Sequence, residues 1–175
     1  GGGSIRIPAS VNGLVGLKPT RARVSEAPIA GDTMSGLVSE FALTRTVRDL
    51  AALLDWVGGP EPGDPYAALP PERPYLEEVG RDPGKLRIAL LTEPLTEDVF
   101  APEVVAAAEA TAKRLEGLGH EVTRPDLSAA GDGAELFPTF MTRWAAGNAA
   151  TAATIAAIVG RELTADDAEP LTWAL

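Results

Sequence analysis

Several scarcities limit the chemistry that this sequence can support. Its 175 residues include no cysteine and a single histidine. Without cysteine the chain can form neither a disulfide nor a thiolate metal site, which favours a reducing, cytoplasmic location. No cluster of metal-ligating residue types is present either, so we expect no cofactor. The sequence also lacks a run of 18 apolar residues, and we therefore expect no membrane-spanning helix and no membrane partner.

Basic residues are scarce as well. Lysine and arginine number 15 against 25 aspartates and glutamates, which gives a net charge of −10. Twenty of the acidic residues lie in 61–175, and no stripe of Lys and Arg interrupts them. Nucleic-acid binding requires clustered basic side chains that neutralise phosphates. The sequence therefore predicts an acidic, solvated surface and no nucleic-acid partner.

Apolar residues, by contrast, make up 45% of the chain, and glycine occurs 18 times. This length and composition suit one domain with its own core, spanning 1–175, and the alternation of strand and helix patterns indicates the α/β class. Residues 1–36 are punctuated by glycine. Within them "GLVGLKPT" predicts a short buried strand followed by a turn, and residues 21–36 predict an ordered loop.

The clearest element is a helix within residues 37–60. Thr46 and Asp49 have the spacing of a capping box, and an apolar stripe runs over 47–57 before two glycines and a proline end it. The next segment, 60–84, carries seven prolines and no sustained period. It predicts an extended connection rather than a helix or strand.

Residues 85–124 show a strand, helix, strand pattern. "KLRIALLTE" predicts a buried strand, Pro102 stands where the first turn of a helix tolerates proline, and "HEVTRPDL" predicts a second strand. Strands joined by a helical crossover are expected to be parallel. Residues 134–175 are predicted to be helical, in one block to 160 and another in "DAEPLTWAL". An aromatic stripe in the first block is expected to be core rather than pocket; it comprises Phe137, Phe140, Met141 and Trp144.

The opening "GGGSIR" offers a candidate for chemistry. Glycines lack a Cβ, so their backbone can approach a ligand closely and turn successive N–H groups toward one point. If Ser4 attacks a carbonyl, the resulting oxyanion would lie in that concavity. A phosphate-binding loop and a plain flexible segment are the alternatives. A Walker loop would need Gly-Lys-Ser/Thr, and a dinucleotide fingerprint would need G-x-G-x-x-G after a strand; neither is present.

A serine nucleophile also needs a proton acceptor, and the chain offers few. His120 lies between a predicted helix and a predicted strand, where a structural role is favoured over a catalytic one. Lys85 and Lys113 are expected to be solvated, and Lys18 precedes a proline in a fixed turn. The residues alone thus supply a nucleophile without an evident base.

Taken together, these motifs resemble the amidase signature family. "GGGSIRIPASVNGLVGLKPTRARVS" resembles the core of that family, and "FALTRTVRDLAALLDWVGG" resembles the loop and helix that follow it. The resemblance implies a mixed central β-sheet flanked by helices, and Ser4 as the nucleophile of an acyl-enzyme. It further implies an oxyanion hole at Gly1, Gly2 and Gly3. Arg6 matches an arginine that helps to hold the loop.

The same resemblance has consequences beyond these positions. In the family a second serine with a cis peptide and a neutral lysine accept the proton, and both belong to motifs that precede this stretch. The resemblance gives Lys18 a structural role in a Lys-Pro turn. It also implies that the chain is an inactive internal fragment of a longer amidase that acts on a small-molecule amide. "TRARVS", "LEGLGHEV" and "GRELTADDAEPLTWAL" resemble the branch of the 6-aminohexanoate cyclic dimer hydrolases. A glutamyl-tRNA amidotransferase A-type subunit and a non-catalytic module are the alternatives, and a homodimer stays open.

Overall fold

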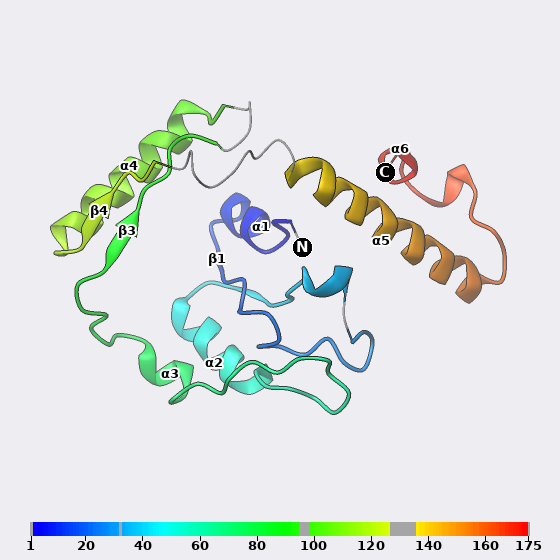
Figure 1. Cartoon of the computed structure of the whole chain (residues 1–175), viewed down its shortest axis with the longest axis horizontal. Coiled ribbons are helices and arrows are strands. Elements are labelled where there is room, and N and C mark those ends of the chain that lie inside the picture. The colour runs from blue at the N-terminus through cyan, green and yellow to red at the C-terminus, as the bar shows by residue number, and fades with distance from the viewer. Residues whose placement is uncertain (1, 32, 95–98, 127–135, 175) are drawn as a thin grey trace. The chain divides into compact units, whose positions relative to one another are not determined.

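The computed structural model describes residues 2–31, 33–94, 99–126 and 136–174 (Figure 1). The chain divides into two compact units, Gly1–Asp82 and Pro83–Leu175. The boundary between them falls at the end of the proline-rich connection. Both helices and strands are present in each unit, so the α/β class is confirmed.

The first unit is built from short elements. They are α1 (Arg6–Val11), β1 (Val15–Gly16), the 3₁₀ helix η1 (Met34–Gly36), β2 (Leu43–Thr44), α2 (Val47–Val57) and α3 (Tyr75–Glu78). Strands β1 and β2 pair antiparallel, with Val15 opposite Thr44. A strand in "GLVGLKPT" is therefore confirmed, but it has two residues and is half-buried rather than buried. The predicted loop over 21–36 contains η1 at its end.

Helix α2 forms where its capping pattern predicts it. The Thr46 side chain accepts a hydrogen bond from the Asp49 N–H at 3.0 Å, which satisfies one of the free donors of the first turn. The helix ends at Gly58, whose N–H donates to the Leu54 carbonyl at 2.9 Å. Its inner face carries most of the buried apolar side chains that the structure describes in this unit: Leu50, Ala51 and Leu54.

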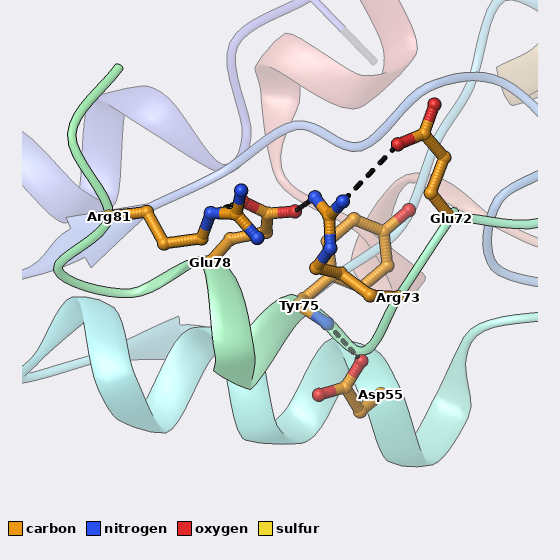
Figure 2. A network of polar contacts seen from close by, with 6 residues as sticks. All are labelled: Asp55, Glu72, Arg73, Tyr75, Glu78 and Arg81. Atoms are coloured by element: carbon orange, nitrogen blue, oxygen red, sulfur yellow. Dashed lines mark hydrogen bonds and ion pairs between the residues drawn. The ribbon is translucent and has the colours of Figure 1, made fainter. Parts of the chain in front are cut away.

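The connection over 60–84 is mostly irregular, as predicted, but it contains the one-turn helix α3. Pro74 precedes that helix and has no side-chain acceptor to cap it. The Asp55 carboxylate on α2 does so instead, accepting the N–H group of Tyr75 at 2.6 Å (Figure 2). The same carboxylate accepts the N–H group of Leu76 at 2.8 Å. Ion pairs surround this contact and join Glu72, Arg73, Glu78 and Arg81 (Figure 2). The proline-rich segment is thereby tied to α2.

The second unit contains the predicted βαβ pattern. Strand β3 (Arg87–Ala89) lies parallel to β4 (Glu121–Thr123), with Ile88 opposite Val122, and α4 (Pro102–Gly117) connects them. Pro102 occupies the first turn of the helix, as predicted. The strands are shorter than the sequence patterns suggested. Each is half-buried at its central residue and exposed on both sides of it, so the expectation of a fully buried strand is wrong.

The helical region is also confirmed, apart from residues 134 and 135, which lie outside the described residues. It comprises α5 (Leu136–Val159), the 3₁₀ helix η4 (Ala165–Asp167) and α6 (Pro170–Ala174). The aromatic stripe on α5 is not buried as expected, because Phe137 is 61% exposed and Trp144 is 42% exposed. The Phe140 and Trp144 rings contact each other, with centroids 5.5 Å apart.

An ion pair closes the turn after α5. The Nη1–H and Nη2–H groups of Arg161 donate hydrogen bonds to the Asp167 carboxylate, at 2.7 and 2.6 Å. The Thr164 N–H donates to the same carboxylate at 2.7 Å and completes a capping box at η4. The Arg161 hydrogen bonds, followed by those from Thr164, hold the pKa of Asp167 well below its usual range. Among the helices in the described ranges, none has the length and hydropathy to cross a bilayer.

Candidate active site

The candidate nucleophile lies in a turn that leads into α1, a helix that the sequence analysis did not predict. The Ile7 N–H donates to the Gly3 carbonyl at 2.8 Å, and this bond joins the turn to the first helical residues. At the other end Gly13 adopts φ +63°, and the Leu14 N–H returns to the Ala9 carbonyl at 2.8 Å. This pairing is a Schellman closure. The short helix is thus defined at both ends by glycine-containing turns.

Gly16 allows α1 to pack closely against β1. A Cβ at this position would lie 2.9 Å from the Ala9 Cβ and 3.1 Å from the Ile5 carbonyl oxygen. Such contacts are closer than side chains tolerate, so the approach depends on the missing side chain. Ala9 is buried as a result. Because Ile5 directly follows Ser4, this contact positions the serine-bearing turn on the strand.

Gly3 has a backbone conformation that favours glycine. Its φ is +145°, which L side chains rarely adopt. It is buried, whereas the neighbouring Gly2 is exposed. Gly1, which the family resemblance also assigns to the oxyanion hole, lies outside the described residues. The structure thus describes two of the three predicted oxyanion-hole glycines and gives a conformational reason for one of them.

Ser4 lies within this turn and is exposed. Among the residues that the structure describes, its hydroxyl has no hydrogen-bond partner. The backbone N–H groups of residues 3–6 likewise donate no hydrogen bond within the described ranges. A hydroxyl and several backbone donors are therefore available to a ligand at the same short stretch of chain. That is the set of groups that an acyl-transfer site requires on the nucleophile side.

An open pocket of about 440 Å³ lies beside Ser4. It is lined by residues 3–6, Lys18, Thr33 and residues 38–41. Segments that are separated by more than 30 positions in the sequence thus meet at the candidate nucleophile. The amino-acid sequence does not indicate that Thr33 and residues 38–41 line this site, because they show no periodicity.

The pocket lining carries charges of both signs, from Arg6, Lys18 and Glu40. The Lys18 ammonium donates to the Pro19 carbonyl, a contact that fits the structural role assigned to it. Arg6 is exposed, and its side chain has no hydrogen-bond or ion-pair partner within the described part of the chain. Its predicted support of the loop stays a prediction.

The other candidate bases lie in the second unit and have local structural contacts. His120 Nδ1 accepts a hydrogen bond from the Leu86 N–H at 3.3 Å, which links the end of α4 to the start of β3. Lys85 lies 4.0 Å from Glu121, and its side chain is exposed. Lys113 is exposed on α4. These positions agree with the structural and solvated roles that the sequence favours for them.

The fold and the site define a class: an α/β protein that presents a serine on a glycine turn, ahead of a short helix and beside an open pocket. A family model described as Amidase matches residues 1–171. The chain therefore belongs to the amidase family.

Individual relatives support the same conclusion. The chain is 41% identical over 174 residues to the 6-aminohexanoate-cyclic-dimer hydrolase of Pseudomonas sp. (strain NK87), covering 98% of this chain and 35% of that protein. It is 40% identical over 126 residues to the A-type component of the glutamyl-tRNA(Gln) amidotransferase of Staphylococcus saprophyticus, covering 72% of this chain and 26% of that protein.

A solved structure of 6-aminohexanoate cyclic dimer hydrolase complexed with substrate matches with a TM-score of 0.85 and 38% identity, over 98% of this chain and 36% of that one. The predicted amidase fold is thereby confirmed. The chain spans about a third of the length of the hydrolases that it matches.

Proposed function

We propose that this chain is the nucleophile-bearing part of a longer amide hydrolase that acts through a serine acyl-enzyme. The observation that carries the proposal is the site at residues 3–6, where the Ser4 hydroxyl and neighbouring N–H groups are free of internal hydrogen bonds, within the described ranges, beside an open pocket. Family membership supports the same chemistry.

In the proposed reaction the Ser4 oxygen attacks the carbonyl carbon of a small-molecule amide. The carbonyl oxygen becomes an oxyanion, stabilised by backbone N–H groups at Gly1, Gly2 and Gly3; each such donor is worth about 3–4 kcal/mol of barrier. The C–N bond then breaks, and the amine leaves with a proton. Water hydrolyses the acyl-serine and releases the carboxylic acid, which regenerates the Ser4 hydroxyl.

The remaining parts of the proposal follow from the family. The proton of Ser4 would pass through a second serine to a neutral lysine, both outside these 175 residues, and Arg6 would support the nucleophile loop. Linear or cyclic amides of the 6-aminohexanoate type are the proposed substrates, from the names of the hydrolases that the chain resembles. The proposed setting is cytoplasmic, without a cofactor.

The proposal is tested in the full-length protein with Ser4→Ala. Loss of the nucleophile should lower kcat by about 10⁴ to 10⁶ and leave substrate binding largely unchanged. A fluorophosphonate should label the parent protein, with the adduct on the peptide containing "GGGSIR". Ser10→Ala is the matched control, because Ser10 is an exposed serine on the adjacent α1. Full activity in Ser4→Ala, or an adduct on another serine, would overturn the assignment.

The identity to an amidotransferase component favours a second candidate, in which the amide is glutamine and the released ammonia passes to an acceptor. The same serine would form the acyl-enzyme. Assays of glutamine and of alkyl amides on the full-length protein distinguish the two. Turnover of glutamine alone would favour the amidotransferase, and turnover of alkyl amides would favour the hydrolase.

A further inference from the structure

The pocket beside Ser4 contains a carboxylate that the proposed acyl transfer does not use. Glu40 lines this pocket and is exposed. Its side chain has no hydrogen-bond or ion-pair partner in the described part of the chain. Some carboxylates elsewhere are paired, as Glu109 is with Arg124 at 2.8 Å and Asp167 is with Arg161. Glu40 is therefore available to a ligand.

Glu40 does not neutralise the cations of the same pocket. Arg6 and Lys18 also line it, but no ion pair within 4.0 Å joins either of them to Glu40 among the described residues. A charge left open in a ligand pocket contributes to selectivity, because it favours ligands of opposite charge and disfavours those of like charge. Glu40 would favour a cationic group of the ligand, whereas Arg6, whose side chain also has no partner in the described residues, would favour an anionic group elsewhere on it.

The neighbours of Glu40 indicate what carries that cation. Val38 and Phe41 line the pocket on the same segment. Apolar side chains next to a carboxylate fit a chain of methylene groups that ends in an ammonium group. The methylene groups would contact the apolar side chains, and the ammonium group would contact the carboxylate.

We propose that Glu40 is a specificity-determining residue that binds an ammonium group on an aliphatic part of the substrate. This inference rests on the proposed function of Ser4. Glu40 contributes to binding and takes no part in bond breaking, so it selects substrates without setting the chemical rate. It favours linear amides with an amino-terminated alkyl chain over cyclic amides, which carry no ammonium group.

The test compares two linear amides in the full-length protein, one ending in an ammonium group and one ending in a methyl group of similar size. Glu40→Gln should raise KM for the ammonium substrate by about 3- to 5-fold, because an exposed charge pair contributes at most about 1 kcal/mol. The kcat for that substrate, and both constants for the methyl substrate, should change less than about twofold. The KM of Glu40→Asp for the ammonium substrate should lie between those of the parent protein and Glu40→Gln. Glu77→Gln, on exposed α3, is the control that should change nothing.

A second measurement needs no variant. The preference of the unmodified protein for the ammonium substrate should fall as ionic strength rises, because salt screens an exposed charge pair. A preference that does not depend on salt would overturn the inference, as would a Glu40→Gln variant that loses activity equally on both substrates or on neither. Fluorophosphonate labelling of Ser4 keeps the two proposals apart. If Ser4 is labelled and Glu40→Gln has no selective effect, only the role of Glu40 fails.

Discussion

The two units of the chain maintain their structures in different ways. Residues 2–82 contain a six-residue α1 and two-residue strands, and depend on turns, close glycine contacts and the polar link from Asp55 to α3. The second unit depends on regular helices, including α4 with 16 residues and α5 with 24. The candidate nucleophile lies in the irregular unit. Function is often carried by irregular segments that a scaffold positions, and such segments depend on particular residues more than regular helices do.

Among the substitutions that compare the two units, the largest difference is expected between two glycines, one from each unit. Gly3→Ala in the full-length protein places a Cβ where φ is +145° and 2.7 Å from the Ile7 Cδ1. The Ile7 side chain can move away, but alanine rarely adopts this φ, so the turn must shift, which misaligns N–H donors beside Ser4. We expect kcat to fall by about 10² to 10³, measured by steady-state kinetics on an alkyl amide.

Gly117→Ala is the matched control in the regular unit. Gly117 ends α4 with a helical backbone, and an added Cβ would meet nothing within 4 Å. Activity should be unchanged, and stability should rise by about 0.5–1 kcal/mol because alanine favours the helix. Equal effects of the two substitutions on activity would show that the units do not differ in this way.

The difference between irregular segments and regular helices also determines which elements the sequence predicted. Thr46 with Asp49, and Pro102, are local signals whose meaning does not depend on the rest of the chain, so α2 and α4 were predicted. Helix α1 was missed because "RIPASV" is too short to show a period and contains Pro8 and two β-branched residues. Residues 38–41 became part of the pocket through a tertiary approach that no local pattern encodes.

Burial was the least predictable property. The 47–57 helix has the apolar stripe that the sequence predicts, but only part of that stripe is buried, since Val47 is 58% exposed while Leu54 is buried. The stripe on α5 likewise contains apolar side chains that are not buried. Periodicity identifies which residues share a face, whereas the packing of that face depends on neighbours that the pattern does not specify.

A smaller effect is expected where a side chain from one element caps another. Asp55→Ala removes the acceptor of the Tyr75 and Leu76 N–H groups. By analogy with the loss of an N-cap, unfolding free energy should fall by about 1 kcal/mol. The connection over 60–74 should also be cleaved faster in limited proteolysis, since its link to α2 is lost.

Asp55→Asn provides the control for this contact, because it keeps one side-chain oxygen as an acceptor. It should retain part of the stability and slow the proteolysis relative to Asp55→Ala. Urea denaturation of the full-length protein measures the first quantity. If both variants unfold at the same urea concentration as the parent, the Asp55 contact does not hold the connection in place.

The smallest expected effect concerns the ion pair that closes the turn after α5. Arg161, and then Thr164, donate hydrogen bonds to the ionised Asp167 and lower the pKa of its carboxyl. A carboxyl with a lowered folded-state pKa stabilises the folded turn above its unfolded value, near 3.9, and loses this contribution as pH falls through the folded value. Both groups are solvent-accessible, so the effect on overall stability should be slight.

Because of the lowered pKa, we expect the ¹³C resonance of the Asp167 carboxyl to stay at its ionised position from pH 7 down to about pH 4. In Arg161→Gln it should titrate at higher pH than in the parent, and the Thr164 amide resonance should shift with it. An Asp167 resonance that titrates identically in both proteins would show that Arg161 does not hold this turn.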